Sequence, residues 1–182
     1  LSVWNVSSVT NMADLFNGAS VFNQDLSSWD VSSVENMSRT FARTTAFDQA
    51  LGGWDVSSAT NMAEMFKGAV LFNQDVSSWD ITALKPEPED EENPHNGMDE
   101  MFVGTRLSQE SYSAMLQSWA GLAENFSDPD DEDAAFPVDV AFGAGNTPYS
   151  PSAAAAREIL VDEYNWNITD AGQGDSEAFY RA

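Results

Sequence analysis

Apolar residues in the first half of the chain recur at a constant spacing of 25 residues. The clearest copy spans 26–47, with apolar residues Leu26, Trp29, Val31, Val34, Met37, Phe41 and Phe47. The copy before it carries Leu1, Trp4, Val6, Val9, Met12, Phe16 and Phe22, and the copy after it carries Leu51, Trp54, Val56, Ala59, Met62, Phe66 and Phe72. This periodicity predicts stacked repeats, because a single unit could not bury its own hydrophobic side.

The start of each copy has the pattern of a short strand. Trp29 and Val31 alternate with polar residues, and a β-branched valine suits a half-buried strand. We therefore predict parallel strands, one per repeat, within 1–6, 26–31, 51–56 and 76–81.

The middle of each copy has helical spacing. Positions i, i+3, i+4 and i+7 of one copy form an apolar helical face, made of Met62, Met65, Phe66 and Ala69. Ser57 or Ser58 is a candidate N-cap, and Gly68 is suited to end the helix. The predicted fold class is an α/β solenoid with one short parallel strand and one short helix per 25-residue repeat.

The rest of the chain predicts an α+β region that covers the end of the repeats. A helical face begins after the candidate N-cap Ser108 and contains Tyr112, Met115, Leu116 and Trp119. Strand-like alternation follows in 138–142, a helix starts at Pro151, and a last short strand falls at 166–168. We expect a repeat region, 1–105, and a capping region, 106–182, because terminal units must cover the exposed core.

Two acidic insertions interrupt this scheme, at about 85–97 and about 127–136. Both are rich in Asp or Glu, and the simpler interpretation is a pair of solvated loops. The alternative is a calcium site, since clustered carboxylates bind hard cations, with Asp128, Asp130 and Asp131 as candidate ligands. Neither insertion follows the EF-hand spacing.

The repeated phrases resemble one known family. Leu26-x-x-Trp29-x-Val31 resembles a leucine-rich-repeat strand, and the unit with its Met-Phe-x-Gly-Ala and Phe-Asn-Gln-Asp phrases is similar to the BspA-like leucine-rich-repeat surface proteins. The segments around Ser111-Tyr112, Thr147-Pro-Tyr149 and Trp166-Asn-Ile168 resemble that family's closing region. The resemblance implies a right-handed coil on a secreted or cell-surface protein, with an adhesive or scaffolding role and no enzyme activity.

The charge of the chain limits its partners. Its 30 acidic and 7 basic residues give a formal net charge of -23, which repels nucleic acids and anionic membrane surfaces and favours cations or basic partners. No cysteine is present, so disulfides and thiolate sites are excluded. No apolar run reaches membrane-spanning length, and the residues that follow Leu1 do not have the pattern of a signal peptide. Because the sequence opens within a repeat, we expect it to be the ordered piece of a longer precursor or array.

An acidic column is expected on the outer face of the repeats. If Trp29 and Val31 point inward, Asp30 points outward, and stacking aligns it with Asp55 and Asp80. Strands lie about 4.8 Å apart, so these like charges would repel one another. Bridging cations, a basic partner, or screening by the flanking hydroxyls and water could each offset that repulsion, and the sequence leaves these alternatives open. The three aspartates are therefore weak calcium candidates.

Catalytic chemistry has little support. The single histidine, His95, lies in the first acidic insertion, and no nucleophile motif accompanies it. Carboxylate pairs suited to a hydrolase are plentiful but unselective among 30 acidic residues. Asn-x-Ser/Thr sequons make Asn5, Asn125 and Asn167 candidates for glycosylation, whereas Asn36, in a column of repeated asparagines, is expected to bond to the backbone.

The sequence thus favours a non-enzymatic extracellular or cell-surface structural or adhesion module that binds a protein partner, without nucleic-acid binding or membrane insertion. The alternative is a calcium- or glycan-binding module that uses the Asp and Ser columns and the acidic loops. A carboxylate-pair hydrolase is the third hypothesis. No cofactor other than calcium is expected.

Overall fold

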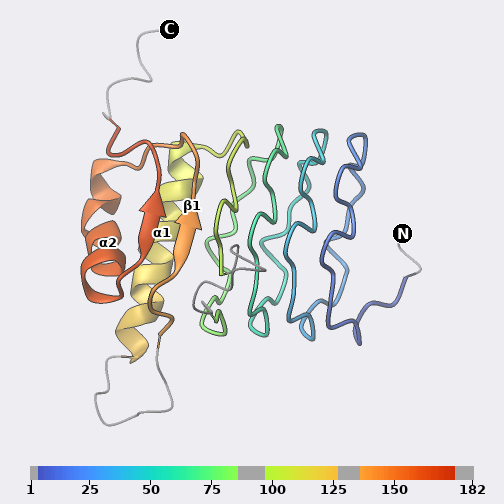
Figure 1. Ribbon diagram of the computed structural model, residues 1–182, viewed down its shortest axis with the longest axis horizontal. Helices are drawn as coiled ribbons and strands as arrows, with labels where there is room; N and C mark the ends of the chain where they lie inside the picture. Colours follow the sequence, from blue (N-terminus) through green and yellow to red (C-terminus); the bar gives the residue numbers. More distant parts are fainter. Residues whose placement is uncertain (1–3, 86–96, 127–135, 175–182) are drawn as a thin grey trace, which may run out of the picture.

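The computed structural model describes residues 4–85, 97–126 and 136–174. Figure 1 shows a row of turns lying side by side from the N-terminus onward, with the helices and strands gathered at the other end. The elements are α1 (Gln109–Ala123), η1 (Glu124–Phe126), β1 (Ala141–Gly143), η2 (Pro151–Ala153), α2 (Ala154–Glu158), η3 (Ile159–Glu163) and β2 (Asn167–Thr169). Most of both acidic insertions, 86–96 and 127–135, lies outside the described residues.

The predicted α/β solenoid is wrong. In 4–85 and 97–107 there is no helix and no strand, only turns, bends and isolated bridges. The bridges join Asn11 to Asn36, Asn36 to Asn61, and Met98 to Phe142 in the capping region. The sheet that the described residues form is a parallel pair in the capping region, β1 with β2, in the register Ala141↔Asn167.

The expected strands do not form because their N–H groups bond within the same segment. The Trp29 N–H donates to the Leu26 carbonyl (3.0 Å), and the Trp54 N–H donates to the Leu51 carbonyl (2.9 Å). Such bonds, three residues apart, close turns. These N–H groups are therefore not available to a neighbouring strand.

The expected helices fail for a different reason. Each segment has a residue with left-handed φ two positions after its methionine, namely 60° at Asp14, 53° at Arg39 and 54° at Glu64. A left-handed residue interrupts a right-handed helix. The N–H groups then alternate between local carbonyls and carbonyls of the neighbouring segment: Met65 N–H bonds to Met62 (3.2 Å), and Phe66 N–H bonds to Met101 (3.0 Å).

Segments 25 residues apart are nevertheless joined directly. We call 4–25 unit 1, 26–50 unit 2, 51–75 unit 3, and 76–85 with 97–107 unit 4. The N–H groups of Met12 and Phe16 donate to carbonyls of unit 2, at Asn36 (2.8 Å) and Thr40 (2.9 Å), and the same pattern recurs between the later units. The 25-residue period of the sequence is therefore the spacing of contacts between units, although each unit is built from turns.

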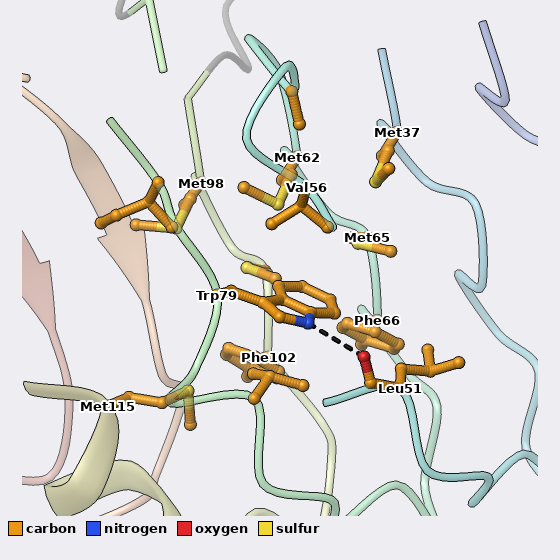
Figure 2. Packing of buried hydrophobic residues seen from close by; sticks show 14 of the residues in the cluster. Met37, Leu51, Val56, Met62, Met65, Phe66, Trp79, Met98, Phe102 and Met115 are labelled. Carbon is orange, nitrogen blue, oxygen red and sulfur yellow. Dashed lines mark hydrogen bonds between the residues drawn. The ribbon is translucent and has the colours of Figure 1, made fainter. Parts of the chain in front are cut away.

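Aromatic rings run through the interior in columns. Phe16, Phe41, Phe66 and Phe102 have successive ring centroids 5.5 Å apart. Phe22, Phe47 and Phe72 form a second column at 5.9 and 6.1 Å, and Phe72 then contacts Phe102 at 6.2 Å. Figure 2 shows Phe66, Phe102 and Trp79 together, with the Trp79 Nε1–H donating to the Leu51 carbonyl (3.0 Å). The aromatic columns predicted to be core are thus buried, apart from their first members.

The capping region closes unit 4. Ser108 caps α1 as predicted, its hydroxyl accepting the Ser111 N–H (3.1 Å). The ring of Phe142, on β1, meets Phe102 edge-on at 6.1 Å. β1 and β2 lie within one to three residues of the predicted strands, whereas the second predicted helix is divided among η2, α2 and η3.

Candidate functional site

The outward strip consists of the residue after each tryptophan: Asn5, Asp30, Asp55 and Asp80. All four are exposed, as predicted from the alternation. Each Oδ1 accepts two bonds from the residue two positions later. Asp30 accepts from the Ser32 N–H (3.2 Å) and hydroxyl (2.7 Å), and Asp55 accepts from the Ser57 N–H (3.1 Å) and hydroxyl (2.6 Å). The carboxylates therefore close their own turns.

These bonds favour the ionised form of Asp30 and Asp55. The Ser32 hydroxyl, and then its backbone N–H, lower the pKa of Asp30, while the charge of Asp55 raises it. The Ser57 hydroxyl and N–H likewise lower the pKa of Asp55. The repulsion expected between neighbouring carboxylates is therefore present at Asp30, but the hydrogen bonds outweigh it.

The metal predictions remain untested. Among the described residues, no three or more His, Cys, Asp or Glu side chains gather closely enough to hold a metal ion, so Asp30, Asp55 and Asp80 do not form such a group. Asp128, Asp130 and Asp131 lie outside the described residues, as does His95.

The glycosylation candidates all lie at the surface. Asn5 is exposed at the start of the strip, Asn125 is exposed in η1, and Asn167 is exposed at the first residue of β2. Asn36 is partly buried, and its Oδ1 accepts the Ser38 N–H (2.9 Å), so its predicted bond to the backbone is confirmed.

Sequence reasoning missed a ladder of polar side chains along another edge of the units. The Oδ1 atom of Asn23 accepts the Asp48 N–H (3.0 Å), Asp48 accepts the Asn73 N–H (3.0 Å), and Asn73 accepts the Ser108 N–H (2.7 Å). The ladder therefore extends from unit 1 to the N-cap of α1. The recurring Asn or Asp after each Phe of the Phe-Asn-Gln-Asp phrase was the signal that could have revealed it.

A charged row crosses the units at the left-handed positions. Arg39 donates to Asp14 through Nε and Nη2, both at 2.8 Å, and the Arg39 bonds lower the pKa of Asp14 to about 2. The Lys67 Nζ atom lies 3.5 Å from Glu64 Oε2, and it also forms an ion pair with Glu100. Beside this row is a polar groove of about 260 Å³, lined by Ala13, Asn36, Ser38, Arg39, Asn61, Ala63 and Glu64.

Both the strip and this groove fall inside a family match. Residues 1–89 match the model of a family described as "Mycoplasma protein of unknown function, DUF285". No curated protein and no solved structure matches the chain. The family match therefore includes units 1 to 3 and the start of unit 4, and it does not reach the capping region.

The capping region has its own groove, of about 520 Å³, between α1 and the start of η2. Its walls are mostly Ser and Gln: Ser108, Gln109, Glu110, Ser113, Ala114, Gln117, Ser150 and Ser152. The Gln109 amide donates to the Tyr149 carbonyl (3.1 Å), and the Gln117 amide donates to the Ser152 carbonyl (2.9 Å). These bonds hold η2 on α1, which gives the groove walls a structural role.

A buried polar network ties α1, α2 and β2 together. The Tyr112 hydroxyl (2.6 Å) and the Arg157 Nε–H (2.8 Å) both donate to Asp170 Oδ2. Burial, and then the bond to Asp170, raise the pKa of the Tyr112 phenol. The phenol therefore stays protonated and acts as a donor, which suits a structural lock better than proton transfer.

No helix in the described parts is both long and apolar enough to cross a membrane.

Proposed function

We propose that the chain is a non-enzymatic structural and adhesion module of the BspA-like surface proteins, secreted or displayed on the cell, that binds a protein partner. The family matched by 1–89 is associated with such proteins. The observation that carries the proposal is the strip, an evenly repeated set of exposed, ionised carboxylates on units locked together by backbone bonds. A rigid array of like charges suits a basic surface on a partner.

Binding through the strip should be weak per site and sensitive to salt. The strip consists of short polar side chains, without the aromatic or arginine residues that dominate tight protein interfaces. Exposed charges are screened within about 8 Å at physiological ionic strength. Adhesion would therefore depend on many copies acting together on one surface.

The test compares beads coated with the chain and beads coated with the variant Asp30→Asn, Asp55→Asn, Asp80→Asn. Asn5 already makes the same two turn bonds, at 3.1 and 2.8 Å, so asparagine should preserve the turns while removing three charges. The matched control removes three exposed charges from the capping region through Glu158→Gln, Asp162→Asn and Glu163→Gln.

The readout is bead retention on cultured epithelial cells and on immobilised matrix proteins under flow. We expect the strip variant to lose most of its retention, the capping-region control to keep it, and added salt to weaken wild-type retention. An equal loss of retention in both variants would assign adhesion to overall charge, and undiminished retention of the strip variant would place adhesion elsewhere; either result would contradict a role for the strip. Absence of retention for the wild-type chain on every surface would contradict adhesion itself.

The polar groove supports glycan binding as a second candidate function. Asn36 and Asn61 amides, the Ser38 hydroxyl, Arg39 and Glu64 line about 260 Å³, and such groups can bond to sugar hydroxyls. Saturation-transfer NMR against a panel of mono- and disaccharides tests it, with Ser38→Val as the groove variant and Ser152→Val, in the other groove, as the control. Transfer that survives Ser38→Val would place the sugar elsewhere.

A further inference from the structure

The polar groove presents two amide groups whose nitrogen atoms have no partner. Asn61 Oδ1 accepts the Ala63 N–H (2.9 Å), just as Asn36 Oδ1 accepts the Ser38 N–H (2.9 Å). These bonds fix the orientation of both amides and leave each Nδ2 unused. Neither Nδ2 donates a hydrogen bond within the described residues, and neither is among the buried polar atoms that lack a partner. Both nitrogens are therefore open to a ligand in the groove.

The backbone holds these two donors at a defined spacing. Asn36 and Asn61 are paired by a parallel bridge, and the Met37 N–H donates to the Asn61 carbonyl (2.8 Å). Residues paired in this way lie about 4.8 Å apart, and because both side chains make the same turn bond, we expect their Nδ2 atoms to keep that spacing. One oxygen about 2.9 Å from both nitrogens would meet them at an angle of roughly 110°. That angle suits a carbonyl oxygen, whose two lone pairs accept two donors.

The charged groups of the groove disfavour an ionic ligand. The Arg39 guanidinium already donates to Asp14 through Nε and Nη2, both at 2.8 Å. The Glu64 carboxylate forms part of the wall, and the Lys67 Nζ atom lies 3.5 Å from it. An anion would face Glu64 in a chain of net charge -23, and a cation would face Arg39. The groove therefore fits a neutral ligand that offers oxygen acceptors.

We propose that the polar groove binds an N-acetylated amino sugar through its acetamido group. The acetamido carbonyl oxygen accepts hydrogen bonds from Asn36 and Asn61 Nδ2. The acetamido methyl group lies against Ala13 and Ala63, the apolar part of the lining, and the Ser38 hydroxyl remains for a ring hydroxyl. A volume of about 260 Å³ is below the range of about 300–1,000 Å³ for drug-sized ligands, so a single sugar residue suits it. The proposal rests on glycan binding as the second candidate function and specifies the sugar.

The test is an NMR titration with methyl N-acetyl-β-glucosaminide and methyl β-glucoside, which differ only in an acetamido or a hydroxyl group at one carbon. The side-chain NH2 signals of Asn36 and Asn61 report the contact directly. The groove variant is Asn61→Asp, which keeps an oxygen for the Ala63 N–H and removes the donor. The matched control is Asn11→Asp, because Asn11 Oδ1 accepts the Ala13 N–H (2.8 Å) in the same kind of turn but Asn11 does not line the groove.

We expect the N-acetylated sugar to shift both NH2 signals and to bind at least about tenfold more tightly than the glucoside, since the acetamido oxygen accepts two hydrogen bonds. Asn61→Asp should abolish this preference, and Asn11→Asp should preserve it.

Equal affinity for the two sugars, with shifts in the groove, would overturn the acetamido assignment and leave glycan binding intact. A preference that survives Asn61→Asp would overturn the assignment as well. If neither sugar shifts the two NH2 signals, the assignment is wrong, and the saccharide panel then decides whether the groove binds any other glycan. The signals of the unaltered chain give the first and third outcomes without relying on the folding of a variant.

Discussion

Replacing Asp170 with alanine should destabilise the capping region more than any other single polar substitution there. Asp170 Oδ2 accepts the Tyr112 hydroxyl (2.6 Å) and the Arg157 Nε–H (2.8 Å), and Oδ1 accepts the Gly172 N–H (2.9 Å). The Asp170 side chain is 3% exposed and that of Arg157 is 24% exposed. Asp170→Ala leaves a buried hydroxyl and a largely buried guanidinium without their acceptor.

The magnitude follows from this geometry. Breaking a buried ion pair by removing one partner costs about 3–5 kcal/mol, and we expect about 4 kcal/mol for Asp170→Ala. Tyr112→Phe removes only one bond to a charged group, which contributes about 1.5–3 kcal/mol. In the Tyr112→Phe variant, Asp170 still bonds to Arg157 and to the Gly172 N–H. The stability lost by this variant should therefore lie near the lower end of that range.

The assay is urea unfolding at neutral pH, followed by tryptophan fluorescence, on the two single variants and the double variant. In the Asp170→Ala background, Tyr112→Phe should cost almost nothing, so the two changes should be coupled by about 1 kcal/mol or more. A cost below about 1 kcal/mol for Asp170→Ala, or strict additivity, would refute the idea that the network locks α1 to α2 and β2.

Three further predictions concern the units. Asp48→Ala should lower stability by about 1 kcal/mol because the Asn73 N–H loses its acceptor, whereas Asp48→Asn should be nearly neutral in the same denaturation assay. Arg43→Gly should raise Tm slightly, because Arg43 has φ of 57°, which costs a non-glycine residue about 1–2 kcal/mol; a lower Tm would contradict this. The ion pair of Arg39 with Asp14 lowers the pKa of Asp14 from 3.8 to about 2. The stability that this pair contributes is therefore fully present above pH 3.8 and is lost as the pH falls toward 2. The Tm difference between wild type and Asp14→Asn should therefore shrink over that range, and a difference that grows on acidification would contradict the pairing.

Burial could be predicted from the sequence far better than backbone conformation. The periodic columns identify core residues such as Met62 and Phe66, both fully buried. The same columns led to wrong helices, because spacing of three and four residues also arises when turns close every three residues. The left-handed positions that decide between the two carry Asp14, Arg39 and Glu64, not the glycine that usually marks them.

The candidate site was predictable in part. The exposure of Asp30, Asp55 and Asp80 follows from the alternation with buried tryptophans. Their turn-closing role could have been read from the Ser or Thr two residues later, a common Asp-turn signal. The polar groove could not have been predicted from the sequence, because Asn36, Asn61 and Glu64 come together only through the contact between units.

Serine side chains of the molecule itself act against the repulsion expected between the carboxylates of the strip. The Ser32 hydroxyl is the largest influence that lowers the pKa of Asp30, ahead of the Ser32 N–H, and the charge of Asp55 opposes both. At Asp30 and Asp55, the serine two residues later therefore favours the ionised carboxylate.

This argument predicts the outcome of a carboxyl titration by NMR. Ser32→Ala should raise the pKa of Asp30, because the hydroxyl donor is lost while the Asp55 charge remains. Ser28→Ala, at an exposed serine in the preceding turn, is the control and should leave the titration unchanged. Because the bonded carboxylate favours the folded state only while ionised, the stability that it contributes is lost as the pH falls through its lowered pKa. If Ser32→Ala leaves Asp30 unchanged while added calcium shifts it, a cation, and not the serine, offsets the charge of the strip.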